Sequence, residues 1–290
     1  PSLAASWRMI DEEWMQPAQD VMSNLKFRLS IGTAGNNNVD LGYLHFDYLS
    51  NPSSYMQGFD NTLKDGGSSL IAANPNLKWE TSEQIDLGLD ARFLNDRLSL
   101  GIDWYKKTTK DLLVSFAPSP EIGVKSTMAN AGNVENRGLE FELGWKDRIG
   151  EVTYGINANF STLKNKVTAL HKALNRIEAS QGGVSGLNYQ IRTAFEVGEP
   201  IWYFRGYKYA GANPEDGTPL YYNHDGEVVS DVTDNDLTKI GKAIPDATYG
   251  ITISLAWKGF DFAAFGTGTI GNDIFSLLYS ADRPRTNCLS

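Results

Sequence analysis

Hydrophobic and polar residues alternate strictly along several stretches of this chain. In residues 84–93 the odd positions Ile85, Leu87, Leu89 and Phe93 are apolar, and most of the even positions are polar. The same pattern returns in 98–104, 139–145, 154–160 and 251–257. A period of two predicts β-strands with one apolar and one polar face. Stretches of roughly ten residues exceed the usual five to six of globular strands and suit strands that cross a membrane.

We therefore predict an all-β, antiparallel transmembrane β-barrel segment, with apolar side chains outward and polar side chains inward. About nine spanning strands are expected, near residues 25–34, 84–93, 98–107, 134–145, 152–163, 189–196, 201–209, 248–257 and 260–270. Bacterial single-chain barrels close with an even number of strands, and open edges in lipid are costly. The remaining strands are expected to come from segments outside this sequence.

Short and long connections alternate along the chain. Short turns are predicted at 94–97, 146–150, 198–200 and 258–259, and long excursions at 35–79, 107–133, 165–188 and 211–244. In a meander, alternate connections lie on the same rim, which predicts short periplasmic turns and long extracellular loops. Aromatic residues beside the short turns are expected to form an interfacial girdle: Phe93, Trp145, Trp257 and Phe260. Gly132 and Gly138 are expected at bulges or bends.

Composition leaves one structural alternative open. Apolar residues make up 41% of the chain and mean hydropathy is slightly negative, as in a soluble β-sandwich whose buried face would also alternate. The chain has no run of about eighteen apolar residues, so no transmembrane helix is predicted. The net charge of −9, without sequence clusters of basic residues, argues against a nucleic-acid partner. The single cysteine, Cys288, excludes an intrachain disulfide.

Ordered sequence blocks resemble one family over nearly the whole chain. They are 25–36 (LKFRLSIGTAGN), 74–84 (NPNLKWETSEQ), 104–113 (WYKKTTKDLL), 130–140 (NAGNVENRGLE), 206–211 (GYKYAG), and 258–262 (KGFDF) with 271–274 (GNDI). In sequence and order these blocks are similar to the C-terminal half of SusC/RagA-type TonB-dependent outer-membrane transporters.

The resemblance implies a 22-stranded barrel plugged by an N-terminal domain. Residues 1–290 would be a partial barrel domain, with the plug, the TonB box and the last strands absent from this chain. The chain starts at Pro1 without Met or a signal peptide, and we interpret it as an internal piece of a longer polypeptide. The family implies active import of oligosaccharides or peptides across the outer membrane of a Gram-negative, Bacteroides-like bacterium. Implied partners are a SusD-like surface lipoprotein lid, TonB–ExbB–ExbD acting through the missing N-terminal part, and outer-membrane lipid.

The candidate site is the set of polar residues expected to face the lumen. They are Asp86, Asp90, Arg92, Asp103, Glu140, Glu142, Asn157 and Asn159. Charges on the lipid face would cost a few kcal/mol near the midplane, so these side chains should meet water or the plug. A hydrated wall that contacts the plug is favoured over a polar lining for solute passage.

No catalytic or cofactor site is predicted. His45, His171 and His224 are scattered without metal-ligand spacing. The acid-rich stretch 225–236 could offer oxygen ligands to Ca²⁺, but it lacks the EF-hand spacing. We expect no enzyme activity, no cofactor and no metal. The alternatives are a soluble secreted or periplasmic β-rich carbohydrate-binding module and a glycan hydrolase, which would need a defined carboxylate pair.

Overall fold

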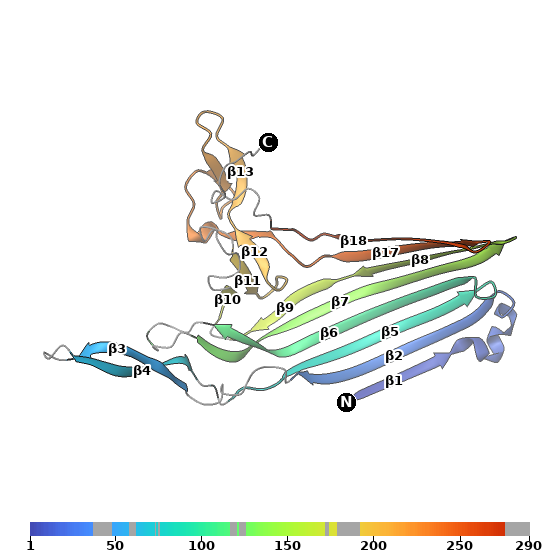
Figure 1. Ribbon diagram of the computed structural model, residues 1–290, viewed down its shortest axis with the longest axis horizontal. Helices are drawn as coiled ribbons and strands as arrows, with labels where there is room; N and C mark the ends of the chain where they lie inside the picture. Colours follow the sequence, from blue (N-terminus) through green and yellow to red (C-terminus); the bar gives the residue numbers. More distant parts are fainter. Residues whose placement is uncertain are drawn as a thin grey trace.

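The computed structural model describes residues 1–36, 48–57, 62–72, 74, 76–116, 121, 126–171, 174–178 and 192–275. Its main element is a long antiparallel sheet that forms a tilted wall (Figure 1). In sheet order its strands are β1 (Ser2–Arg8), β2 (Met22–Asn36), β5 (Glu80–Phe93), β6 (Leu98–Phe116), β7 (Ser126–Ile149), β8 (Val152–Thr162), β17 (Ala247–Trp257) and β18 (Phe260–Ile270). The predicted antiparallel strands over 84–107, 134–163 and 248–270 are confirmed.

The short connections all lie at one end of the wall, on the right in Figure 1. Leu94, Asn95 and Asp96 turn β5 into β6 with positive φ angles. Lys258 (φ 46°) and Gly259 (φ 85°) join β17 to β18, and Trp257 pairs directly with Phe260. Two central residues with positive φ form the tight hairpin turn that matches strand twist. The third turn lies later than the predicted 146–150, because β7 continues to Ile149.

Two predicted spanning strands, 189–196 and 201–209, are wrong, because neither belongs to the wall. The region between β8 and β17 is a single excursion, and most of it forms two small sheets outside the wall. After β9 (Lys164–Leu170), which pairs with β7, comes a sheet of β10 (Arg176–Glu178), β11 (Arg192–Glu196), β12 (Tyr203–Gly206) and β16 (Thr238–Gly241). The turn predicted at 198–200 is confirmed: it lies in the connection between β11 and β12, which pair antiparallel, and Gly198 has a positive φ angle. The predicted strand 189–196 begins outside the described residues, at 189–191. Its described part is short, and Ala194 and Phe195 are both buried, so it lacks a one-sided pattern.

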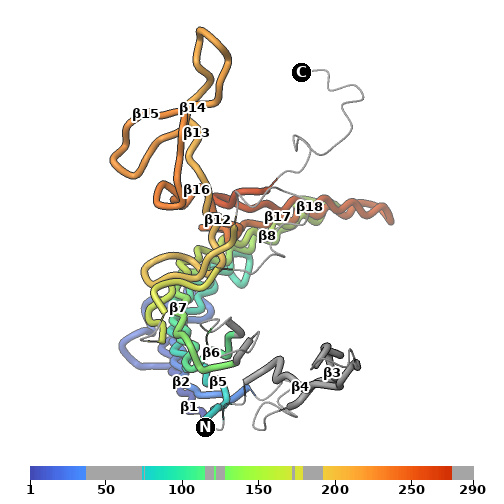
Figure 2. The backbone as a smooth tube through the Cα atoms, turned by 90° about the vertical axis from the view of Figure 1, so that its left-hand side faces the viewer, coloured from blue at the N-terminus to red at the C-terminus, as the bar shows by residue number. Residues whose placement is uncertain are grey.

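A second small sheet extends this excursion. It consists of β13 (Lys208–Ala212), β14 (Pro219–Tyr222) and β15 (Val228–Val229). Figure 2 shows these strands projecting away from the wall. The strands β1, β3 (Tyr48–Gln57) and β4 (Thr62–Ala72) were not predicted, and β3 and β4 pair with each other within the first long excursion.

Helical structure is limited to short 3-10 segments in the described residues. They are η1 (Met9–Asp11), η2 (Glu13–Ala18) and η4 (Asp234–Asp236). In that part of the chain, no helix has the length and apolar character needed to cross a membrane.

The main buried cluster lies where the excursion packs on the long-loop end of the wall. Val114, Val134, Val167, Ile177 and Phe195 pack together there from β6, β7, β9, β10 and β11. The predicted irregularity at Gly132 is confirmed, whereas the register of β7 does not shift at Gly138. Gly132 lies at a register shift between β6 and β7, and Gly138 lies where β7 changes partner from β8 to β9.

Candidate functional site

All eight predicted site residues lie on one face of the wall, here called the polar face. Residues paired across antiparallel strands point to the same side of a sheet. The rows that contain them are Ser30–Asp86–Tyr105–Gly138, Arg28–Gly88–Asp103–Glu140, Lys26–Asp90–Gly101–Glu142–Asn159 and Asn24–Arg92–Ser99–Gly144–Asn157. The structure therefore brings them together on β5–β8. That this face lines a lumen stays a prediction.

An arginine that was not predicted organises the centre of the polar face. The Nε atom of Arg28 lies 2.8 Å from Oδ2 of Asp90, and its Nη2 atom lies 2.9 Å from Oδ1 of the same carboxylate. The Nη2 atom also lies 3.0 Å from Oδ1 of Asp103. A Cβ atom at Gly88 would lie 2.3 Å from Asp103 Oδ1 and 2.8 Å from Arg28 Cζ, so the glycine leaves the space that this network fills. The sequence signal was a basic residue at a polar position of a strand.

Asp86 is also held by neighbours on the wall. Its carboxylate accepts hydrogen bonds from Ser30 Oγ (2.7 Å) and Gln84 Nε2 (2.8 Å). The residues Arg28, Ser30, Asp86, Asp103, Tyr105 and Glu140 line a hollow of about 620 Å³ on this face. Three predicted carboxylates are thus engaged within the wall, an arrangement typical of a structured polar surface.

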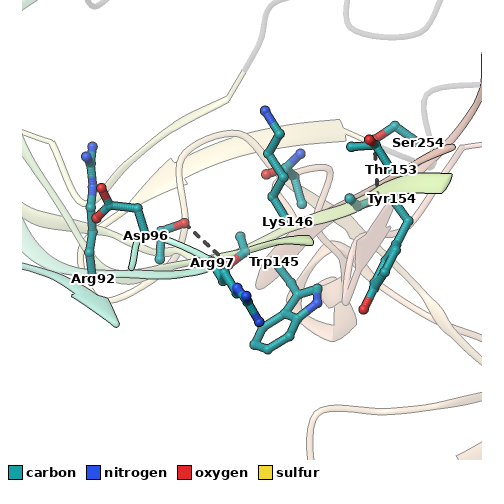
Figure 3. Close-up of a pocket in the computed structure, with 12 residues that line it drawn as sticks. Arg92, Asp96, Arg97, Trp145, Lys146, Thr153, Tyr154 and Ser254 are labelled. Atoms are coloured by element: carbon teal, nitrogen blue, oxygen red, sulfur yellow. Dashed lines mark hydrogen bonds between the residues drawn. The ribbon is translucent and has the colours of Figure 1, made fainter. Parts of the chain in front are cut away.

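A second hollow, of about 420 Å³, lies nearer the short turns. Figure 3 shows Arg92 and Lys146 on one side of the sheet and Trp145 and Tyr154 pointing to the other. Neighbouring residues such as Trp145 and Lys146 therefore face opposite environments, as the alternation predicts.

The opposite side of the wall, here called the apolar face, carries a continuous belt of large apolar side chains. Its rows include Phe27–Leu89–Ile102–Phe141–Phe160–Tyr249, Leu29–Leu87–Trp104–Leu139 and Leu25–Ala91–Leu100–Leu143–Ala158–Ile251. Many are exposed, including Ile253 at 39% and Trp257 at 51%. An exposed apolar surface of this extent needs an apolar environment or a partner. Of the four predicted girdle aromatics, Phe93, Trp257 and Phe260 lie at the ends of their strands beside the short turns, and Trp145 lies four residues before the end of β7.

Charged residues also stabilise the small sheet of the excursion. The Glu178 carboxylate accepts hydrogen bonds from Arg176 (2.8 Å), Arg192 (2.7 Å) and Arg205 (2.9 Å), which belong to β10, β11 and β12. Partial burial alone would raise the pKa of Glu178, but the hydrogen bonds from Arg192 and Arg176 and the charge of Arg205 outweigh it. The pKa therefore lies below its ordinary value, and the carboxylate ties three strands together.

In the acid-rich stretch, Asp236 is engaged by hydrogen bonds within the loop. Oδ2 of Asp236 accepts hydrogen bonds from the backbone N–H (2.7 Å) and Oγ1 (2.9 Å) of Thr233. Oδ1 accepts one from the backbone N–H of His224, and these bonds keep the pKa of Asp236 below its usual range. Throughout the described residues, no three His, Cys, Asp or Glu side chains converge to hold a metal ion. His45 and Cys288 lie outside the described residues.

Comparison with known proteins gives consistent matches. A family model described as "TonB dependent receptor-like, beta-barrel" matches residues 1–272. TonB-dependent receptor P3 of Formosa agariphila is 32% identical over 95% of this chain and 28% of its own length. TonB-dependent receptor SusC of Bacteroides thetaiotaomicron is 30% identical over 95% of this chain and 28% of its own length.

The solved structures agree with the sequence matches. A chain from the structure of the RagAB peptide transporter is 26% identical, with a TM-score of 0.78 over 93% of this chain. The chain spans about 28% of the length of each of these relatives.

Proposed function

This chain belongs to the family of TonB-dependent receptor-like β-barrels, and we propose that it forms part of the barrel wall of an outer-membrane nutrient importer. The observation that carries the proposal is the separation of the two faces over β2 and β5–β8 of the wall. Charged and amide side chains share one face, and a belt of exposed apolar side chains covers the other. A wall between lipid and a hydrated interior requires this separation.

In this proposal, residues 1–290 supply a portion of the barrel, while the plug, the TonB box and the last strands come from other parts of the polypeptide. The polar face, with the eight predicted residues, would line the interior. Arg28 is paired with Asp90 and Asp103, and Asp86 is hydrogen-bonded to Ser30. These contacts support a hydrated wall that touches the plug, rather than a dedicated path for the solute.

The importer would bind its substrate at the long-loop end and move it through the barrel without covalent chemistry. The matched relatives are named as receptors and as a transporter, which supports a function other than catalysis. Oligosaccharides and peptides are both candidate substrates, and the name of the RagAB peptide transporter supports the second. A SusD-like lipoprotein would cover the extracellular rim, and TonB–ExbB–ExbD would supply energy through the plug.

The test is an analysis of the parent protein in its native membrane. Membranes of the source bacterium are extracted in mild detergent, and the species that carries this sequence is isolated and weighed by intact mass spectrometry. We expect a parent well above 32.0 kDa that is associated with a lipoprotein and retains an oligosaccharide or peptide. A detergent-free, soluble species of 32.0 kDa would contradict the proposal and favour a β-rich carbohydrate-binding module.

A further inference from the structure

The apolar face becomes basic at its long-loop end. Lys106 lies two residues beyond Trp104 on β6, and Arg137 lies two residues beyond Leu139 on β7. Lys106 pairs with Arg137, which in turn pairs with Lys164 of β9, so the three side chains form one cross-strand row. Lys110 and Lys166 lie further along the same face. Together, Lys106, Lys110, Arg137, Lys164 and Lys166 are called the basic belt.

Charges within the basic belt are only partly balanced. Glu135 lies 2.9 Å from Lys106 and 3.8 Å from Arg137, and Glu83 lies 2.7 Å from Lys110. These two carboxylates face five basic side chains, whereas the chain as a whole carries a net charge of −9. The belt is therefore a local positive surface on an acidic protein.

Lys164 and Lys166 are the most available members of the belt. Both are exposed, and in the part of the chain that the structure describes neither forms an ion pair. They also line a hollow of about 370 Å³ with Lys239 and Lys242. The last two lysines have their own carboxylate partners, Glu199 and Asp246. The hollow thus presents two uncompensated ammonium groups.

The height of the belt above the short turns matches the edge of a bilayer. On β7 the apolar face runs from Ile149 beside a short turn to Leu139, ten residues away, and its one charged position is Asp147 near the turn. At about 3.3 Å per residue, this segment is about 33 Å long. With a strand tilt of about 40°, it is about 25 Å tall, the height of the apolar band of outer-membrane barrels. The basic belt begins directly after this band.

We propose that the basic belt binds the phosphate groups of anionic lipid headgroups in the outer leaflet of the outer membrane. The inference rests on the proposed function, because it needs the apolar face in lipid and the long loops outside. Flexible lysine side chains at the edge of an apolar surface extend to the headgroup level, where they attract anionic groups. Lys106, Arg137 and Lys164 are spaced along one row, which suits several phosphate groups on neighbouring lipids or on one lipid.

The test uses the full-length parent protein, purified in mild detergent. Native mass spectrometry measures binding of two added probes, phosphorylated lipid A and the same lipid after removal of its phosphates. The variant pair is Lys164→Gln with Lys166→Gln, and the control pair is Lys107→Gln with Lys146→Gln, whose side chains lie on the polar face. We expect affinity for phosphorylated lipid A to fall roughly fivefold for each belt lysine removed.

The controls separate this inference from the proposed function. The control pair should leave binding unchanged, and neither pair should affect binding of the dephosphorylated probe. Equal affinity of the belt variants and the wild type, in a protein that resides in the membrane, would overturn the lipid site alone. Loss of a bound lipoprotein in place of lipid would also overturn it. A parent that never enters the membrane would contradict the proposed function itself.

Discussion

At the scale of single residues, three glycines of the wall have different tolerances for a side chain. A Cβ atom at Gly138 would lie 1.9 Å from the backbone oxygen of Thr162. At Gly88 the nearest atoms belong to the flexible side chains of Asp103 and Arg28, which can move away. At Gly266, on the apolar face, the nearest atom is 3.8 Å away.

We therefore predict that Gly138→Ala destabilises the folded barrel by about 1–3 kcal/mol, as overpacking against fixed atoms does. The measurement is the fraction of parent protein that migrates as a folded, heat-modifiable species in outer membranes. Gly266→Ala is the matched control and should assemble normally. Normal assembly of Gly138→Ala would mean that β7 and β8 separate more easily at this point than their geometry indicates.

The Glu178 cluster predicts that the stability of the small sheet β10–β12 depends on pH. Since the folded-state pKa of Glu178 is lowered, its stabilising effect is present above the ordinary carboxyl pKa and is lost as pH falls through the folded-state value. The hydrogen-exchange protection factors of residues 192–206, taken relative to the intrinsic exchange rate at each pH, should therefore fall on acidification. Glu178→Gln should remove this dependence and destabilise the small sheet by about 3 kcal/mol, because Arg205 is only 7% exposed and would lose its carboxylate partner.

The same measurement has an internal control in the wall. The protection factors in β17 should change little over this pH range, because Glu178 contacts β10–β12 and lies outside the wall strands. An equal fall in the protection factors of β17 and of residues 192–206 would instead indicate global unfolding and would contradict a local role for Glu178.

At the scale of elements, the alternation of residues was sufficient to predict which side chains share a face. Every predicted site residue lies on the polar face, because a period of two leaves no freedom once a strand is regular. The assignment of 189–196 and 201–209 to the wall was wrong because short buried strands and short spanning strands look similar in sequence. Ala194 and Phe195 are neighbours that are both buried, which distinguishes this strand from a spanning strand with one exposed face. Burial on both sides depends on tertiary packing.

The first strand was missed for a related reason. In β1 the apolar side chains Leu3 and Trp7 alternate with Ser2, Ala4 and Ser6, a weak contrast in a strand of seven residues. The basic belt was also not predictable, because Lys106 and Lys164 are far apart in sequence. Only the register of β6, β7 and β9 brings them into one row.

The apolar face predicts a simple asymmetry between neighbouring residues. Ile253→Lys should destabilise the membrane-inserted barrel by about 2–4 kcal/mol, the cost of a lysine facing lipid near the midplane, and should therefore impair assembly. Thr252→Lys, one residue away on the polar face, is the matched control and should assemble. Leu87 and Leu100 occupy the same face as Ile253, and polar substitution there should have the same effect. Normal membrane assembly of all three variants would show that the apolar face does not meet lipid.

At the scale of the whole molecule, the alternation of short and long connections defines an orientation. Short turns follow β5, β7 and β17, whereas the excursion between β8 and β17 carries two small sheets and projects from the opposite end. Large hydrophilic excursions belong on the extracellular side of outer-membrane barrels, and tight turns on the periplasmic side. The orientation is independent of the substrate and can be tested without knowing it.

The orientation can be tested by cysteine labelling at two positions that are similarly exposed and lie at opposite ends of the wall. The side chain of Asp225, in the excursion, is 67% exposed, and that of Glu151, in the turn between β7 and β8, is 64% exposed. In a full-length parent in which Cys288 is replaced by serine, Asp225→Cys should react with a membrane-impermeant maleimide on intact cells. Glu151→Cys should react only after the outer membrane is permeabilised. Labelling of Glu151→Cys on intact cells would reverse the orientation, and with it the placement of the basic belt in the outer leaflet, while leaving the barrel fold intact.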